Sequence, residues 1–103
     1  MAMKKAKANG KAPAVIVRTC SAGVHYGHLV EQSADGKRVV LIQAKRIWSW
    51  KGANTLHEIA LRGVGQGSRV SEAVESITLT EAIETIVCAP AGAEAMEKAS
   101  WLA

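Results

Sequence analysis

Apolar and polar residues alternate through the first half of the chain, which is typical of strands that are buried on one face. Residues 14–20 are rich in β-branched side chains and follow Pro13, so we expect a strand there. Residues 24–31 form a second such run, which Gly27 interrupts. A glycine inside a strand indicates a bulge or a close backbone approach, and we expect one of these at Gly27.

A hairpin signal, Asp35-Gly36, separates the second run from the next apolar stretch. That stretch, residues 37–50, is long enough for one bent strand or for two short ones. We therefore expect the second and third strands to pair antiparallel across a tight turn.

One helix is well marked in the middle of the chain. Thr55 and Glu58 have the spacing of a capping box, in which the hydroxyl and the carboxylate accept hydrogen bonds from exposed backbone N–H groups. Gly63 suits the end of this helix, so we expect it to span about residues 55–62. The residues after Pro90 have high helix propensity and predict a second, C-terminal helix.

Residues 77–88 fit two patterns. Helical spacing fits them almost as well as alternation does, but the threonines and isoleucines favour a strand. Alternation places four apolar residues on one strand face: Ile77, Leu79, Ile83 and Val87. The elements together predict an α+β domain, with a small antiparallel sheet of four to five strands, one short crossing helix and a C-terminal helix.

The charge of the chain is concentrated at its start. The net charge is +4 over 103 residues, and four of the 13 Lys and Arg residues lie in the first twelve positions. The nine that remain balance nine Asp and Glu residues, so the body is neutral, unlike a DNA-binding domain with a basic face. We expect residues 1–12 to be a flexible basic tail and residues 13–103 to be a single ligand-binding domain that binds no DNA.

Hydropathy gives no indication of a membrane protein. No apolar run reaches the roughly 18 residues of a membrane-spanning helix, and the lysine-rich start lacks the apolar region of a signal peptide. We therefore expect a cytoplasmic protein without membrane contact. In that compartment Cys20 and Cys88 are expected to be reduced, partly buried thiols.

Catalytic chemistry has little support in the sequence. Cys20 has His25 and His28 nearby, but positions 25 and 28 of a strand face opposite ways. No close Cys/His pair has the spacing of a zinc module. We therefore expect neither an enzyme nor a metal site, and no cofactor.

Two tryptophans two residues apart are the most informative feature. In an extended chain Arg46, Trp48 and Trp50 share one face, while Ile47 points to the other. A tryptophan beside an arginine can stack on a purine and bind a phosphate, although the tryptophans can equally fill the core under the helix. Asn54 precedes the predicted helix, where its amide either supports the cap or meets a base edge.

A glycine-rich loop, residues 63–71, follows the predicted helix. It lies after a helix rather than before one and lacks the Walker lysine, so a flexible surface loop is favoured over a nucleotide-binding motif. Arg69 and Ser71 at the far end of this loop are nevertheless candidates for contact with an anion.

Four segments resemble, in the same order, a family of small phage-encoded proteins: RTCSAGVHYG, AKRIWSWKGANTLHEIA, GSRVSEAV and ITLTEAIETIVC. The resemblance runs from about Val15 to Cys88, which is most of the body. The family is that of the Thoeris anti-defence protein 1 sponges, oligomeric binders that sequester cyclic ADP-ribose isomers made by bacterial TIR-domain enzymes. Some of these proteins are also implicated in binding cyclic oligonucleotide signals, and they do not cleave what they bind.

The resemblance implies a ligand with two phosphates, two riboses and a purine. In that case RTCSAGVHYG forms a strand, a bend and a strand whose small residues admit the ligand or a neighbouring subunit. Residues of the types that the ligand calls for are Arg18, Ser21, Arg46, Arg69 and the two tryptophans. Family members stack the base on an aromatic residue near the start of the helix, where this chain has Asn54. The base-stacking residue is then one of Trp48, Trp50, Tyr26 and His25, or the ligand preference differs.

The function implied by the resemblance is a non-catalytic sponge of the host cytoplasm. It acts as a dimer-based homo-oligomer, with a hexamer as one form, and holds the signal at subunit interfaces. The alternative is a structural or adaptor protein that uses the Trp48/Trp50 face for contact with another protein. A third interpretation is a nucleic-acid binder that depends on the lysine tail.

Overall fold

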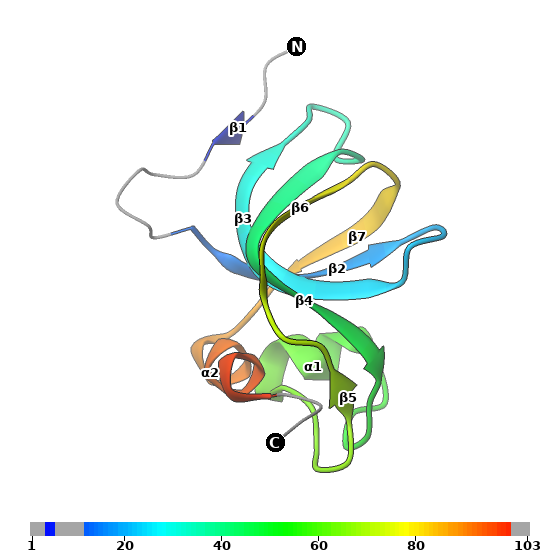
Figure 1. The fold of residues 1–103 in the computed structure, drawn as a ribbon, viewed down its shortest axis with the longest axis vertical. Coiled ribbons are helices and arrows are strands. Elements are labelled where there is room, and N and C mark those ends of the chain that lie inside the picture. The colour runs from blue at the N-terminus through cyan, green and yellow to red at the C-terminus, as the bar shows by residue number, and fades with distance from the viewer. Residues whose placement is uncertain (1–3, 6–11, 100–103) are drawn as a thin grey trace.

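The computed structural model describes residues 4–5 and 12–99, and it confirms the predicted α+β class (Figure 1). The elements, in chain order, are β1 Lys4–Lys5, β2 Ala14–Thr19, β3 Val24–Gln32, β4 Val39–Ser49, α1 Leu56–Arg62, β5 Arg69–Val70, β6 Val74–Leu79, β7 Ala82–Val87 and α2 Pro90–Lys98. Most of the expected basic tail lies outside the described residues. The exception is β1, whose backbone pairs with the end of β3 at Glu31 and Gln32.

The strands form one curved antiparallel sheet in the order β5-β4-β3-β2-β7, to which β1 adds at β3 and β6 adds at β4. Of the described strands, β2, β3, β4, β6 and β7 have six residues or more, and β1 and β5 have two each. The prediction of four to five strands therefore matches the longer strands. The two helices lie together at one end of the sheet, beside β5 (Figure 1).

The β3–β4 hairpin has the predicted turn and the predicted irregularity. Gly36 has a φ of 79°, which glycine adopts without strain, and β4 continues as one strand that bends at Gln43 with a φ of 48°. The pairing of β3 with β4 shifts register around Gly27, where a Cβ would stand 2.9 Å from Cβ of Leu41 and 3.3 Å from Cα of Ala44. Gly27 therefore allows both the bulge and the close approach of the two strands.

Residues 77–88, whose pattern fits both a strand and a helix, lie mainly in strands as predicted, but they belong to two strands, β6 and β7. A turn at residues 80–81 separates β6, which pairs with β4, from β7, which pairs with β2. The prediction of one shared apolar face is therefore wrong, because the turn changes the direction of the chain. Ile77 and Leu79 pack against the core, whereas Ile83 and Val87 are exposed.

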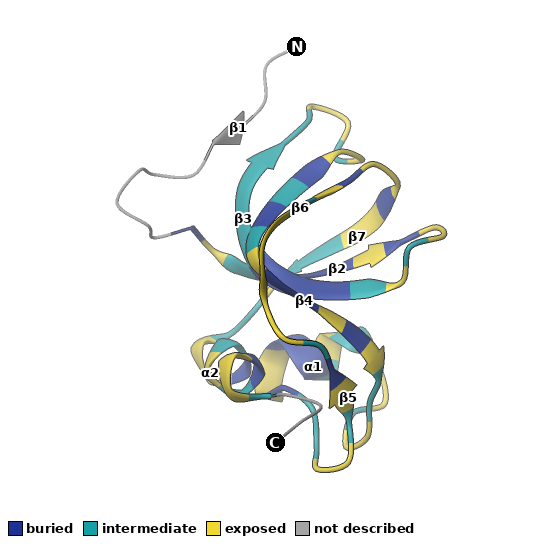
Figure 2. Cartoon of the chain, viewed as in Figure 1, coloured by how far each residue is buried: buried dark blue, intermediate teal, exposed yellow. Residues whose placement is uncertain are grey.

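Two apolar clusters lie on opposite faces of the sheet, since alternate residues of each strand point to opposite sides. Buried residues are interspersed with more exposed ones along β4 (Figure 2). The cluster between the strands, called the strand cluster below, comprises Val15, Val17, Val39, Leu41, Ala44, Leu79 and Ala82. The cluster under the helices, called the helix cluster below, comprises Ile16, Tyr26, Ile47, Ile59, Ala60, Val70 and Met96.

The predicted capping box forms at the start of α1. The Glu58 carboxylate accepts a hydrogen bond of 2.9 Å from the Thr55 N–H, and Gly63 ends the helix with a φ of 83°. Helix α2 then packs closely against α1, because Gly92 lies where any Cβ would stand 2.0 Å from the carbonyl oxygen of Ala60. Pro90 is the first residue of α2, a position that tolerates its missing N–H.

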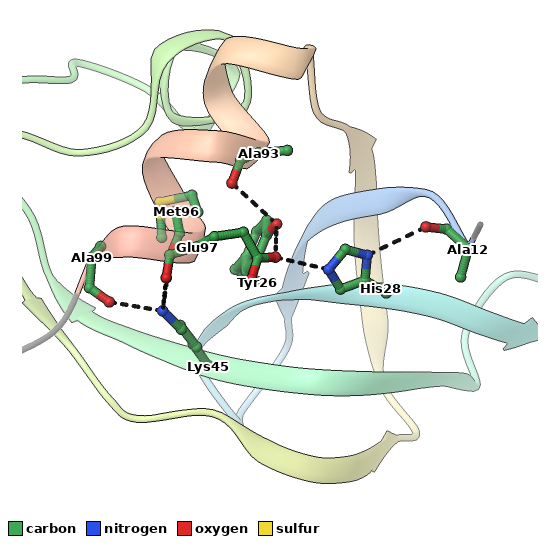
Figure 3. Close-up of polar contacts among 8 residues, drawn as sticks. All are labelled: Ala12, Tyr26, His28, Lys45, Ala93, Met96, Glu97 and Ala99. Carbon is green, nitrogen blue, oxygen red and sulfur yellow. Dashed lines mark hydrogen bonds and ion pairs between the residues drawn. The ribbon is translucent and has the colours of Figure 1, made fainter. Parts of the chain in front are cut away.

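A buried lysine fixes the end of α2 to the sheet. The Lys45 side chain, on β4, donates hydrogen bonds to the carbonyl oxygens of Met96, Glu97 and Ala99 at 3.0, 2.9 and 2.8 Å (Figure 3). The last carbonyls of a helix have no partner within it, and a cation there also interacts favourably with the helix dipole. Lys45 is only 8% exposed, so this arrangement is part of the core.

A second set of contacts holds α2 to β3. The Tyr26 hydroxyl donates to the Glu97 carboxylate at 2.6 Å, and Nε2 of His28 lies 2.8 Å from the same oxygen (Figure 3). Partial burial raises the pKa of Glu97, but the hydrogen bonds from Tyr26 and His28 outweigh it, so the net pKa is lowered. Burial, together with the hydrogen bond to Glu97, raises the pKa of Tyr26.

Candidate ligand-binding site

The segment RTCSAGVHYG forms the end of β2, a tight turn and the start of β3. The Thr19 hydroxyl organises this turn, because it donates to the carbonyl of Gly23 at 2.8 Å and accepts from the N–H of Ala22 at 2.8 Å. Gly23 has a φ of 87°, which favours glycine. The small residues of the turn leave the carbonyl of Ala22 accessible to neighbouring side chains.

The side chains of Arg46 and His25 both contact the carbonyl oxygen of Ala22. Nη2 of Arg46 donates to the oxygen of Ala22 at 2.5 Å, and Nε2 of His25 lies 2.9 Å from the same oxygen. Because a carbonyl only accepts, His25 carries its proton on Nε2. Burial lowers the pKa of His25 and the charge of Arg46 lowers it further, against an opposing hydrogen bond to Ala22, so this ring is neutral at pH 7.

The turn and β4 enclose a shallow pocket of about 300 Å³. It brings together four of the predicted site residues: Ser21, Arg46, Trp48 and Trp50. A second pocket, of about 410 Å³, adjoins the first across Val24 and Trp50, which line both. Arg18, Thr55 and His57 line the second pocket, so the start of α1 also contributes to this surface. The two pockets are called the turn pocket and the helix pocket below.

The two tryptophans have different environments. Trp48 is 59% exposed, and the guanidinium carbon of Arg69 lies 5.0 Å from the centre of its ring, in a cation–π contact. Trp50 is half-buried and packs against the helix cluster, as Ile47 does. The predicted common face for Arg46, Trp48 and Trp50 is therefore wrong at Trp50, because β4 ends at Ser49. All three residues nevertheless line the turn pocket.

Carboxylates accompany two of the predicted polar residues. Nη1 of Arg18 lies 3.6 Å from the Glu84 carboxylate, and the Ser21 hydroxyl donates to Glu81 at 2.6 Å. An anion that binds at Arg18 therefore competes with Glu84 for the guanidinium. Arg46 of the turn pocket contacts the backbone carbonyl of Ala22 instead of a carboxylate.

The glycine-rich loop is tied to the strand end that precedes α1. The N–H of Gly65 donates to the carbonyl of Lys51 at 2.6 Å, and the N–H of Lys51 donates to Ser68 at 2.9 Å. At the far end of the loop the hydroxyl of Ser71 accepts from the N–H of Arg46 at 2.8 Å. Arg69 contacts Trp48 of the turn pocket but itself lines a separate recess between the loop and α2. Ser71 supports the backbone of Arg46 and does not line the turn pocket.

Three other predicted residues lie away from an open ligand surface or at its margin. Tyr26 is fully buried in the helix cluster, and His25 is 2% exposed. Neither ring offers a free face for stacking, so the structure assigns both to the core, and the prediction of a base-stacking role fails for them. Asn54 is exposed directly before α1, and its N–H hydrogen-bonds to Glu58 in support of the cap.

Sequence reasoning missed several residues of this surface. Val24 forms the boundary between the two pockets, and Leu56 and His57 line the helix pocket from the first turn of α1. Their positions depend on how α1 packs against the sheet, which no local pattern specifies. The structural role of Lys45, by contrast, had a signal in the sequence. Lys45 lies two residues before buried Ile47 on the same strand, so both side chains point to the helix side of the sheet.

The two cysteines line neither the turn pocket nor the helix pocket. Cys20 and Cys88 are free thiols, as expected, but Cys20 is exposed rather than partly buried. Burial raises the pKa of Cys88 to about 11. Within residues 4–5 and 12–99, no group of three His, Cys, Asp or Glu residues is placed to hold a metal ion.

The fold and this surface define a small α+β domain with an arginine- and tryptophan-lined recess at one end of its sheet. The chain belongs to the family described as "Domain of unknown function (DUF6948)", whose model matches residues 12–96. Searches of the curated proteins and of the solved structures found no match. No helix in the described part of the chain is long and apolar enough to cross a membrane.

Proposed function

We propose that the protein is a non-catalytic sponge that binds and sequesters a cyclic nucleotide signal, in the cytoplasm of a phage-infected host. The signals proposed are cyclic ADP-ribose isomers or related cyclic oligonucleotides, as the resemblance to the Thoeris anti-defence protein 1 family implies. The ligand remains intact, and its removal from solution deprives the downstream effector of its activator.

The observation that carries this proposal is the composition of the turn pocket. Ser21 of the β2–β3 turn lines one recess with Arg46 and Trp48 of β4, and Arg69 stacks on Trp48. A guanidinium supplies two or more donors to a phosphate, and an exposed indole supplies a flat surface for a purine. This is the chemistry that a nucleotide with a diphosphate group requires.

The shape of the surface supports binding in an oligomer. Pockets that hold small ligands usually bury most of the ligand surface. The turn pocket and the helix pocket are shallow, so one subunit covers only one side of a cyclic dinucleotide-sized ligand. A second subunit supplies the missing cover in the proposed sponge.

Calorimetric titration tests the proposal directly. The purified protein is titrated with cyclic ADP-ribose isomers and a cyclic trinucleotide, and the ligand recovered after denaturation is identified by mass. Competition with a cellular receptor requires a Kd below roughly 1 μM, or more than about 8 kcal/mol of binding free energy. Saturable binding with intact ligand supports the proposal, and conversion of the ligand contradicts it.

A second candidate function is that of an adaptor, which the exposure of Trp48 favours. Large exposed aromatic residues are common anchors of protein interfaces. A sponge is stabilised by its ligand, so its Tm rises with the concentration of that ligand, whereas an adaptor's Tm does not respond. If no compound of the panel shifts the Tm, the result favours the adaptor.

A further inference from the structure

Strand β7 forms one edge of the sheet. It pairs with β2 on one side, and among the described strands none pairs with its other side. Ile83 and Val87 on this strand are 55% and 69% exposed. Exposed apolar residues on an unpaired edge favour pairing with another strand, which is why such edges usually carry lysines or prolines. Strand β7 carries neither.

The register with β2 shows which backbone groups of β7 point outward. Cys88 donates its N–H to the carbonyl of Ala14, and Ile86 lies opposite Ile16 in the same register. Because hydrogen-bonded pairs alternate in an antiparallel ladder, the N–H and C=O groups of Thr85 and Val87 point away from β2. The free edge therefore offers hydrogen-bonding groups beside the exposed side chains.

The pattern of side chains on this edge is symmetric about Thr85. Ile83 and Val87 lie two residues before and after it. If two copies of the strand pair antiparallel around a two-fold axis at Thr85, the two threonines face each other and each Val87 faces an Ile83, which lies where the pairing of β7 with β2 shifts register. The Thr–Thr and Ile–Val pairs are favourable, and on the other face of the strand each Glu84 lies opposite an Ile86. A two-fold interface of this kind uses the same patch on both copies.

Charge does not oppose this pairing. Glu84 is the one ionisable residue of β7, and it already forms an ion pair with Arg18 of its own chain at 3.6 Å. Each copy thus brings a matched Arg18–Glu84 pair to the interface. The edge formed by β6 differs: it begins with Val74 and continues with polar, exposed Glu75, Ser76 and Thr78. The edge of β7 is therefore better suited to pairing than that of β6.

We propose that a second copy of this chain pairs its β7 antiparallel with β7, with the two-fold axis at Thr85. This interface deepens the proposed function, on which its role in ligand binding rests, because it identifies the partner that covers the helix pocket, which adjoins the turn pocket. Glu84 of β7 and Arg18 of the neighbouring β2 both line the helix pocket. The second copy therefore lies beside the helix pocket, and that pocket is completed by the dimer.

Disulfide trapping tests the register. Thr85→Cys is introduced into a chain in which Cys20→Ser and Cys88→Ala remove the natural thiols, and the protein is oxidised at micromolar concentration. Two cysteines on a two-fold axis of an antiparallel pair lie within the range that a disulfide spans. We expect a covalent dimer with Thr85→Cys and little with the matched control Thr78→Cys on β6. Equal trapping at both positions contradicts the proposal.

Sedimentation without ligand tests the interface independently of function. The wild-type chain is expected to be a dimer or a larger oligomer, and the double variant Ile83→Glu, Val87→Glu is expected to be a smaller species. Leu61→Glu, which changes an equally exposed apolar residue on α1, is expected to leave the assembly unchanged. A monomeric wild-type chain overturns the interface. A dimer that binds no nucleotide leaves the interface standing and contradicts the proposed function instead.

Discussion

Two adjacent cross-strand pairs of the β3–β4 ladder carry similar residues and have opposite roles. Tyr26 pairs with Lys45, and His25 pairs with Arg46. The first pair faces the helices, where Lys45 is almost fully buried and donates to three carbonyls at the end of α2. The second pair faces the β2–β3 turn, where exposed Arg46 contacts the carbonyl of Ala22.

The contrast between Lys45 and Arg46 separates a structural cation from a candidate ligand-binding cation in this fold. A buried cation must have its donors satisfied within the protein, and Lys45 has a carbonyl for each of its three. A guanidinium has five donors, so Arg46 keeps others available after its contact with Ala22. Position on one strand face or the other, together with the number of donors, thus determines which cation is available to a ligand.

The largest effect is expected from replacing each cation by methionine. Lys45→Met leaves the last carbonyls of α2 without a partner and is expected to lower the free energy of unfolding by about 3 kcal/mol. Arg46→Met is expected to change it by less than about 0.5 kcal/mol, since Arg46 lies at the surface. Urea unfolding measures both. Equal losses of stability contradict the separation of roles.

Trp48→Ala tests whether the exposed indole contributes to ligand affinity. The indole is the exposed stacking surface of the turn pocket, and loss of a base–aromatic stack costs about 1–3 kcal/mol, so a roughly fivefold or greater loss of affinity is expected. Calorimetry with the ligand that the wild-type protein binds measures this loss. The control is Leu61→Ala, a comparable exposed apolar residue outside the pocket. If both variants bind equally well, Trp48 does not contact the ligand.

A smaller effect is expected at the contacts of Tyr26. Tyr26→Phe removes the hydrogen bond to Glu97 and is expected to cost about 1 kcal/mol of stability without changing ligand affinity.

Because the pKa of Glu97 is lowered in the folded state, its stabilising contribution is present above its unfolded pKa and is lost as the pH falls through the folded value. Glu97→Gln should therefore weaken the loss of stability in acid, as followed by thermal unfolding from pH 6 to pH 3.

Sequence reasoning recovered the elements whose signals are local. The hairpin at Asp35-Gly36, the bulge at Gly27 and the cap formed by Thr55 and Glu58 depend on a few neighbouring residues, and all appear in the structure. The turn at residues 80–81 was missed, because its flanking residues continue a strand-like pattern on both sides.

The candidate site was recovered in part for a similar reason. Arg46 and Trp48 were found because alternation along one strand places them on the same face. The burial of Tyr26 depends on α2, and its partner Glu97 lies 71 residues further along the chain. Contacts at that separation follow from tertiary packing, which one sequence without a fold does not specify.

The smallest effect concerns His25 and pH. Its pKa is lowered in the folded state, so the unfolded chain binds a proton more readily, and stability is expected to fall as the pH drops below about 6.5. Protonation also places a second charge beside Arg46. Thermal unfolding between pH 7.5 and pH 5 measures the slope. His25→Asn should reduce it, whereas an unchanged slope shows that other groups cause it.

The central claim is that Arg46 belongs to a nucleotide-binding surface. The most direct measurement is calorimetric titration of the wild-type protein, Arg46→Gln and Arg62→Gln with the same panel of cyclic ADP-ribose isomers and cyclic trinucleotide. Arg62 is an exposed arginine of α1 that lines neither pocket. We expect saturable submicromolar binding by the wild-type protein and by Arg62→Gln, and a loss of affinity of roughly tenfold or more in Arg46→Gln. Absence of binding by the wild-type protein, or equal binding by all three, would contradict it.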